Sequence, residues 1–212
     1  MSVRRVIRLP REQLVPYLLE VPLDSGAIAW PAVFGNGRPV EIEVGFGKGL
    51  FLVKASQACP EVNFLGVEIA RKLQFFVANR IAKRTLNNVR LVCTDARHFL
   101  AKQVPAGSVQ AVHVYFPDPW WKQRHRKRRV YQPDFAAACE QVLQPGGRLY
   151  VATDVEAYFE IIQATTAEHT KLILEPPLAE KPPEHDLDYL SNFERKARKV
   201  GKPIWRAVYR KP

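Results

Sequence analysis

The amino-acid sequence predicts an α/β fold in which a mainly parallel sheet of seven strands carries helices on both faces. Three observations support this prediction. From residue 40 onward, short apolar runs alternate with segments of helical periodicity, a glycine-rich turn follows the first run, and an acidic residue stands at or near the end of five runs. Because ligands of such sheets bind outside the carboxyl ends of the strands, these acids mark the expected site.

The length of 212 residues suffices for one domain with a substantial core, and 47% of the residues are hydrophobic. The first 39 residues contain five prolines, so we expect residues 1–39 to form a loosely structured N-terminal arm. The regular pattern that follows predicts a single domain over residues 40–212.

The expected strands cover residues 40–44, 63–67, 89–93, 109–115, 148–152, 172–174 and 204–209, and the expected helices cover residues 50–57, 71–84, 135–143 and 158–166. In the second helix Leu73, Val77 and Ile81 recur at helical spacing. The third helix stops before Pro145-Gly146-Gly147. Residues 175–186 contain four prolines and are expected to form a loop, while residues 191–200 are polar and basic.

The formal net charge of +11 is concentrated in three segments, residues 4–11, 122–129 and 195–211, which hold 18 of the 32 lysines and arginines. Placed basicity of this kind favours a polyanionic partner, and nucleic acid is the polyanion we expect. The alternative is that these segments are solvated basic faces that aid solubility. A membrane surface is disfavoured, because no basic segment forms an amphipathic helix with a large apolar face.

The three cysteines, Cys59, Cys93 and Cys139, are far apart and show no C-x-x-C spacing. This pattern indicates reduced thiols in a cytoplasmic protein and argues against a disulfide framework or a structural zinc. No apolar run is long enough to span a bilayer, and the N-terminus has no apolar core of a secretory signal. The histidines share no spacing with cysteines or acids, so no metal site is expected.

The glycine-rich turn consists of Gly45, Gly47 and Gly49, and Glu43 stands two residues before it. Glycines allow a sharp turn and a close approach of the backbone to a ligand. The spacing is G-x-G-x-G and not the G-x-G-x-x-G of dinucleotide sites. A nearby carboxylate suits a ligand with a positive charge, a sulfonium or an ammonium, better than a pyrophosphate. The alternative is a turn made only for tight packing of strand and helix.

Two further acids follow the next two strands. Glu68 lies 19 residues after Gly49, where a carboxylate can accept both hydroxyls of a ribose. Asp95 follows the third strand and can bind the amino group of an adenine. For each residue the alternative is a capping role at the start of the next helix.

Asp118 is the sharpest single candidate, because Pro117 and Pro119 restrict the backbone on both sides of it. Its alternative is a turn aspartate that caps the next segment. Trp120 and Trp121 follow and can stack on a base, a contact that contributes roughly 1–3 kcal/mol per base. We expect one of the two indoles to belong to the core instead.

The basic run after the tryptophans is expected to hold phosphates. Lys122 is close enough in sequence to Asp118 to reach a phosphate or a base beside it. The cations that follow are expected to form a phosphate track that gives affinity without sequence readout: Arg124, Arg126, Lys127, Arg128 and Arg129. His125 lies among these cations, so we assign it no role as a base.

These residues resemble the bacterial tRNA (guanine-N7-)-methyltransferases. The resemblance rests on E-V-G-F-G-K-G at 43–49, G-V-E at 66–68, D-A-R at 95–97, F-P-D-P-W at 116–120, T-D at 153–154 and S-N-F-E-R-K at 191–196. It runs from about residue 40 to the C-terminus and is most specific in P-D-P-W-x-K-x-R-H. Ser191 departs from the threonine usual in the family but keeps the hydroxyl.

The resemblance implies a class I S-adenosylmethionine-dependent methyltransferase fold, with S-adenosylmethionine as methyl donor and a variable-loop guanine of tRNA as acceptor. It implies that the cofactor contacts Glu43, Gly45, Gly47, Gly49, Glu68, Asp95, Ala96, Arg97 and Asp118, and that Asp118 is also catalytic. Substrate contacts would come from Lys122, Asp154, Ser191, Asn192, Phe193 and Glu194, and RNA contacts from Arg124, His125, Arg126, Lys127, Arg128 and Arg129.

The expected partner is tRNA, with no membrane, and the protein is a monomer or a homodimer. Two other functions stay open on the residues alone. One is a methyltransferase that acts on another RNA base or on protein. The other is a non-catalytic RNA-binding module on the same fold, against which the acids at successive strand ends argue.

Overall fold

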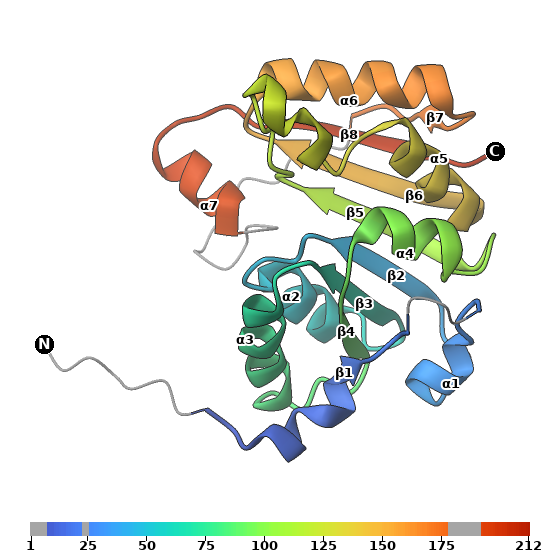
Figure 1. The fold of residues 1–212 in the computed structure, drawn as a ribbon, viewed down its shortest axis with the longest axis vertical. Helices are drawn as coiled ribbons and strands as arrows, with labels where there is room; N and C mark the ends of the chain where they lie inside the picture. Colours follow the sequence, from blue (N-terminus) through green and yellow to red (C-terminus); the bar gives the residue numbers. More distant parts are fainter. Residues whose placement is uncertain (1–7, 23–25, 178–191) are drawn as a thin grey trace, which may run out of the picture.

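The structure is a computed structural model that describes residues 8–22, 26–177 and 192–212. Its described strands form one eight-stranded sheet in the order β1-β4-β3-β2-β5-β6-β8-β7 (Figure 1). The strands are β1 (Leu18–Leu19), β2 (Val40–Val44), β3 (Asn63–Glu68), β4 (Val89–Cys93), β5 (Val109–Tyr115), β6 (Leu143–Thr153), β7 (Ile173–Leu174) and β8 (Trp205–Arg210). Only β8 runs antiparallel to its neighbours β6 and β7 within this described sheet. The prediction of a mainly parallel sheet is therefore confirmed, and all seven expected strands are present.

The helices are α1 (Trp30–Phe34), α2 (Leu50–Ala58), α3 (Arg71–Ala82), α4 (Ala96–Lys102), α5 (Pro133–Val142), α6 (Glu156–His169) and α7 (Asn192–Lys199). Short 3₁₀ helices cover η1 (Arg11–Gln13), η2 (Val15–Tyr17) and η3 (Gln123–Arg128). Apolar residues of α4, α5 and α6 share one core cluster, and those of α2 and α3 share the other. Helices thus cover both faces of the sheet, as predicted.

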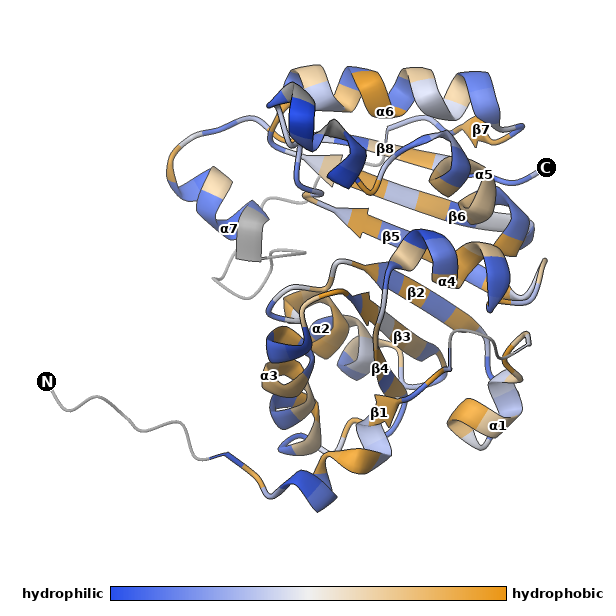
Figure 2. Cartoon of the chain, in the orientation of Figure 1, coloured by the Kyte–Doolittle hydropathy of each residue, from blue (hydrophilic) through white to orange (hydrophobic). Residues whose placement is uncertain are grey.

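The two clusters follow from the alternation of side chains along each strand. On β3, Phe64 belongs to the cluster under α2 and α3, while its neighbour Leu65 belongs to the cluster under α4, α5 and α6. Both are at most 1% exposed. Strands buried on both faces read as continuous apolar runs, which is why the central strands were recognisable. Figure 2 shows this concentration of hydrophobic residues on the labelled strands.

The description of the arm as loosely structured is wrong for parts of residues 8–39. Leu18 and Leu19 form β1, which pairs with β4 at the edge of the sheet, and Trp30 and Phe34 of α1 are buried in the core. The indole N–H of Trp30 donates to Ser108 Oγ at 2.9 Å. Prolines misled the prediction, because η2 and α1 each carry theirs in the first turn, where a missing N–H costs nothing. The division of the chain at residue 39 stays a prediction.

Besides η1, η2 and α1 of the arm, three further described helical segments were not predicted. α4 has only seven residues, and η3 lies inside the basic run. α7 consists mainly of hydrophilic residues (Figure 2), with Ala197 buried at 3% exposure. Only two of its eight residues, Phe193 and Ala197, are apolar, so the segment reads as a polar and basic stretch. No helix within the described ranges combines the length and the apolar character needed to cross a membrane.

The strand order reverses between β2 and β5. The chain runs from β2 outward through β3 to β4, and then returns to place β5 on the other side of β2. Val44 at the end of β2 is in register with Val114 near the end of β5. The glycine turn and the segment with Asp118 therefore leave the sheet side by side, at the position where open α/β sheets bind ligands.

Candidate active site

Glycine is required at the three positions of the turn for different structural reasons. All three have positive φ, 74° at Gly45, 51° at Gly47 and 67° at Gly49, which favours glycine. A Cβ on Gly49 would lie 2.5 Å from Val77 Cγ1, so this glycine lets α2 start against α3. A Cβ on Gly45 would meet nothing within 4 Å, and one on Gly47 only the Gly45 carbonyl oxygen at 3.9 Å. Packing thus explains the third glycine, while open space above the first two allows a ligand to approach their backbone.

Glu68 connects the end of β3 to this turn. Its Oε2 accepts the backbone N–H of Gly47 at 3.1 Å, and its Oε1 accepts the backbone N–H of Ala70 at 3.0 Å. The side chain is partly buried. Each carboxylate oxygen has two lone pairs, so both oxygens keep an acceptor site for hydroxyl groups. The contact with ribose stays a prediction.

Glu43 on β2 is the most perturbed acid of the site. It is 3% exposed, and its Oε2 is buried without a hydrogen-bond partner among the described residues. Burial, with a further contribution from the charge of Glu68, raises the pKa of Glu43 to about 8, against a smaller lowering by the backbone N–H of Leu52. A buried carboxyl with one unused oxygen is stabilised in its charged form by a cationic partner. These properties fit a ligand that carries a positive charge.

Asp95 caps α4, as its alternative interpretation proposed. Its Oδ1 accepts the backbone N–H of Arg97 at 2.9 Å, and its Oδ2 lies 3.5 Å from Arg97 Nη2. The Asp95 side chain is 46% exposed, and Ala96 beside it is buried. The contact of Asp95, Ala96 and Arg97 with a cofactor stays a prediction.

Asp118 lies on a loop with an unusual backbone. Phe116 and Trp120, which flank the Pro117–Pro119 segment, are non-glycine residues with positive φ of 54° and 40°. Such conformations persist only where the surroundings hold them, and they gather at functional sites. The backbone N–H of Phe116 donates to the Ala152 carbonyl at 2.7 Å, which anchors the loop to β6. The Asp118 side chain is exposed beyond the end of β5.

The two tryptophans of this loop lie outside the core clusters, so the expectation that one belongs to the core is wrong. Trp121 is 49% exposed and meets the ring of Tyr158 edge-on, with 6.4 Å between the centroids. Trp120 is partly buried, 5.6 Å from the ring of His125. Both rings lie under a guanidinium, that of Arg128 for Trp120 and that of Arg129 for Trp121. The exposed indole of Trp121 is available for stacking.

The basic run after this loop is not uniform. Lys122, Arg124, Lys127 and Arg128 are exposed, as expected for a phosphate track. His125 accepts a hydrogen bond from Arg124 Nε at 3.1 Å through its Nε2. Arg129 differs, because it is 9% exposed and its Nε donates to the Pro119 carbonyl oxygen at 2.6 Å. The side chain of Arg126 lies outside the described part of the chain.

The C-terminal acids of the predicted site are paired with cations. Asp154, just past β6, lies 3.6 Å from Lys202 Nζ. Glu194 on α7 is 4% exposed and accepts from Arg198 Nε at 3.1 Å and from Arg206 Nη2 at 2.5 Å. The structure does not describe Ser191, the side chains of Asn192 and Phe193, Arg4 and Arg5 of the first basic segment, or residues 178–186 of the predicted loop.

A buried polar cluster under the site was missed in the sequence. His113 Nε2 lies 2.9 Å from Glu41 Oε2 and its Nδ1 lies 2.9 Å from the Tyr115 hydroxyl, while its ring stacks on Tyr150 at 4.9 Å. Burial raises the pKa of Tyr115 well above its usual value, with a further contribution from the charge of Glu43. The signal was available, because residues 41, 43, 113 and 115 alternate along two adjacent strands and share one face.

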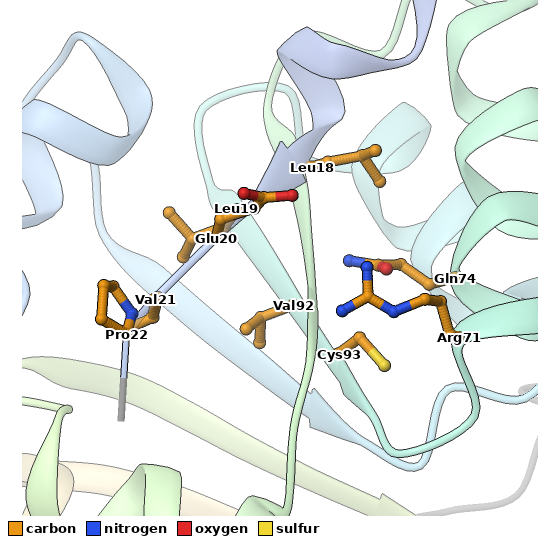
Figure 3. A pocket seen from close by; sticks show the side chains of 9 residues that line it. All are labelled: Leu18, Leu19, Glu20, Val21, Pro22, Arg71, Gln74, Val92 and Cys93. Atoms are coloured by element: carbon orange, nitrogen blue, oxygen red, sulfur yellow. The ribbon is translucent and has the colours of Figure 1, made fainter. Parts of the chain in front are cut away.

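A pocket of about 340 Å³ lies beside β1, the end of β4 and the start of α3 (Figure 3). Its walls come from residues 18–22 of the arm, from Arg71 and Gln74 of α3, and from Val92 and Cys93 of β4. Arg71 and Cys93 each stand within three residues of a predicted cofactor contact, Glu68 and Asp95 respectively. Residues 18–22 of the predicted arm therefore form one wall of a pocket with β4 and α3.

Comparisons with known proteins show the family and the fold of the chain. Residues 37–207 match a family model described as "Putative methyltransferase". A tRNA (guanine-N(7)-)-methyltransferase of Rhodopirellula baltica is 43% identical over 223 residues, covering 98% of this chain and 82% of that protein. Its counterpart in Ralstonia pickettii is 38% identical over 204 residues, covering 95% and 76%. The solved structure of the 16S rRNA methyltransferase KamB superposes with a TM-score of 0.60 at 18% identity, covering 85% and 92%, which shows the common fold.

Proposed function

The chain belongs to the family of tRNA (guanine-N(7)-)-methyltransferases, and we propose that it transfers the methyl group of S-adenosylmethionine to N7 of a variable-loop guanine in tRNA, at the carboxyl ends of β2 and β5. One observation carries the proposal. The reversal of strand order sets the glycine turn after Glu43 beside the loop that holds Asp118. A donor on the turn and an acceptor over the loop would then meet between them.

The donor side of the site fits a cationic nucleoside. Glu43 offers a buried carboxyl oxygen without a partner, and the backbone of Gly45 and Gly47 faces open space. Glu43 would bind the positive charge, Glu68 the ribose hydroxyls and Asp95 the adenine amino group. S-adenosylmethionine supplies a methyl group activated by its attachment to a sulfonium.

The acceptor needs no general base. N7 of guanine has an in-plane lone pair and no proton, so the attacking atom is a nucleophile as it stands. Its methylation leaves the purine with a positive charge, which the carboxylate of Asp118 stabilises as the charge develops. The same carboxylate can instead fix the guanine by accepting from its N1 and N2 protons. Most of the acceleration then comes from the alignment of N7, methyl and sulfur.

The exposed cations of the basic run would hold the tRNA backbone. Lys122, Arg124, Lys127 and Arg128 project from the segment directly after the Asp118 loop. Cations that follow the loop facing the reacting base can bind phosphates of the tRNA, and such contacts give affinity without reading sequence. The exposed indole of Trp121 would stack on a base beside them.

A tRNA substrate and three free cysteines support a cytoplasmic location. The choice between a monomer and a homodimer stays a prediction, which light scattering on the purified protein decides.

Incubation with methyl-labelled donor and bulk tRNA, followed by nucleoside analysis, tests the proposal. We expect the label in 7-methylguanosine, and mapping of the modified tRNA should place it in the variable loop. Label in another nucleoside would favour a methyltransferase for a different base. Absence of S-adenosylmethionine binding by calorimetry would favour the non-catalytic RNA-binding module.

A further inference from the structure

We propose that Arg129 is a positioning residue that holds the Asp118 loop, residues 116–121, in its active conformation, and is not a phosphate contact of the basic run. The inference rests on the proposed function, because it takes the carboxylate of Asp118 as the group that faces the guanine. It concerns the last residue of the cationic run Arg126–Arg129, so composition alone placed Arg129 with the RNA contacts.

The first observation is burial. Arg129 is 9% exposed, whereas Arg124, Lys127 and Arg128 of the same run are exposed. A buried guanidinium requires partners within the protein, because the loss of its hydration is costly. A phosphate oxygen would have to displace the groups that already surround it. The location of Arg129 therefore favours a role inside the protein.

The second observation is the identity of those partners. Arg129 Nε donates to the carbonyl oxygen of Pro119 at 2.6 Å. Pro119 stands between Asp118 and Trp120, the residue with a φ of 40°. A proline has no N–H, so its carbonyl is the one backbone group through which this residue can be held by hydrogen bonding. The hydrogen bond from Arg129 thus holds the loop at the residue that lies between Asp118 and the strained Trp120.

The third observation links the loop to α6. The guanidinium of Arg129 lies 5.3 Å from the centroid of Trp121 and 5.4 Å from that of Tyr158, which is fully buried on α6. The two rings meet edge-on, so the cation, the indole and the phenol form one packed group. The backbone carbonyl of Arg129 in turn accepts from Gln132 Nε2 at 2.9 Å, next to the start of α5. Arg129 therefore ties the Asp118 loop to two helices.

The charges of Arg129 and Asp118 also act on one buried group. Burial raises the pKa of Tyr158 to about 12, the charge of Arg129 lowers it, and the charge of Asp118 adds a smaller increase. Both charges thus act on the same phenol. A planar guanidinium can donate to a carbonyl and stack on rings at once, which an ammonium cannot do. We therefore expect Arg129→Lys to keep the charge and to lose most of the positioning.

The test compares Arg129→Gln with Arg124→Gln, which removes an exposed cation of the same run. The measurements are the single-turnover rate at saturating tRNA and donor, and the dependence of tRNA affinity on salt concentration. A lost phosphate contact reduces the slope of log affinity against log salt by about 0.7–0.9. We expect Arg129→Gln to leave this slope unchanged and to lower the rate at least tenfold, while Arg124→Gln reduces the slope. A surface control, Arg148→Gln, should match the wild type in both measurements.

Three outcomes would overturn the proposal. A reduced salt slope in Arg129→Gln at wild-type rate would make Arg129 a phosphate contact. A wild-type rate in Arg129→Lys would show that charge alone suffices. If Arg129→Gln loses its fold by circular dichroism, the Arg129→Ala variant is assayed with added guanidinium ion, which should restore the rate; no restoration in a folded variant would contradict positioning. Failure of the proposed function is recognised separately, because the wild-type protein would then put no label into 7-methylguanosine.

Discussion

The carboxylate of Glu68 accepts the backbone N–H of Gly47 at 3.1 Å, and this bond ties the end of β3 to the glycine turn after β2. Its other oxygen accepts the backbone N–H of Ala70 at the start of α3. One side chain thus positions the turn and the next helix while it keeps lone pairs for a ligand. Binding and local structure depend here on the same residue.

We predict that Glu68→Gln weakens the binding of S-adenosylmethionine and also destabilises the fold. The amide presents an NH₂ group to one of the two backbone N–H donors, so at least one hydrogen bond is replaced by a repulsive contact. We expect at least a tenfold loss of S-adenosylmethionine affinity by calorimetry, and a loss of stability of about 1–3 kcal/mol by denaturant unfolding. Glu61→Gln, a change at an exposed acid outside the site, is the control. Unchanged affinity in Glu68→Gln would remove this residue from the cofactor site.

The raised pKa of Glu43 predicts that donor binding depends on pH. Below pH 8 the free protein holds a proton on Glu43, and a cationic ligand favours the ionised carboxylate and expels that proton. We therefore expect the affinity for S-adenosylmethionine to rise between pH 6 and pH 8 and then to level off. Calorimetry in buffers of different ionisation enthalpy should detect proton release at pH 7.

The Glu43→Gln variant should bind more weakly at pH 8 and lose this part of the pH dependence. Proton release that persists in Glu43→Gln would assign the effect to another group.

The raised pKa of Glu43 also predicts that the stability of the cofactor-free protein depends on pH. The folded-state pKa of about 8 lies above the ordinary carboxyl value of 4.5, so the folded protein binds the proton more tightly than the unfolded chain. The contribution of Glu43 to the free energy of unfolding is complete below pH 4.5. This contribution is lost as the pH rises toward 8, by up to about 1.4 kcal/mol per pH unit. The free energy of unfolding of Glu43→Gln, minus that of the wild type, should therefore increase with pH across this window. A difference that stays constant would refute the shift.

The glycines of the turn should respond differently to alanine. Gly49→Ala combines a positive φ with a Cβ 2.5 Å from Val77, so we expect a loss of about 2–4 kcal/mol in stability. Gly47→Ala has the strain without the clash, and we expect a loss of about 1–2 kcal/mol together with weaker donor binding. Adding Val77→Ala should recover part of the stability of Gly49→Ala and none of Gly47→Ala. Equal losses in the two single variants would contradict the assigned roles.

Regular elements were predictable where the local pattern is strong. Central strands such as β3 and β5 are continuous apolar runs, and their acidic ends mark the site because parallel strands finish at one edge of the sheet. β1 has two residues, and its position depends on pairing with β4, which no local pattern reveals. α7 has only two apolar residues among eight, and this low apolar content hid the helix in the sequence.

The acidic residues of the candidate site could be predicted from the sequence, whereas the separate roles of its cationic residues could not. Glu43, Glu68, Asp95 and Asp118 were found from their positions after successive strands. Arg129 was grouped with its exposed neighbours because a charge run looks uniform in sequence. Its burial depends on Tyr158, 29 residues further along the chain, and on the path of the Asp118 loop. Tertiary contacts of this kind are not encoded in local spacing.

The central claim is that donor and guanine meet over the carboxylate of Asp118. The most direct test is the single-turnover rate of Asp118→Asn at saturating tRNA and S-adenosylmethionine, with Asp134→Asn as a surface control. The amide keeps the shape and loses the charge that offsets the cationic purine, so we predict a rate at least about 100-fold below wild type with tRNA affinity within about twofold. A rate near that of the wild type would contradict the account.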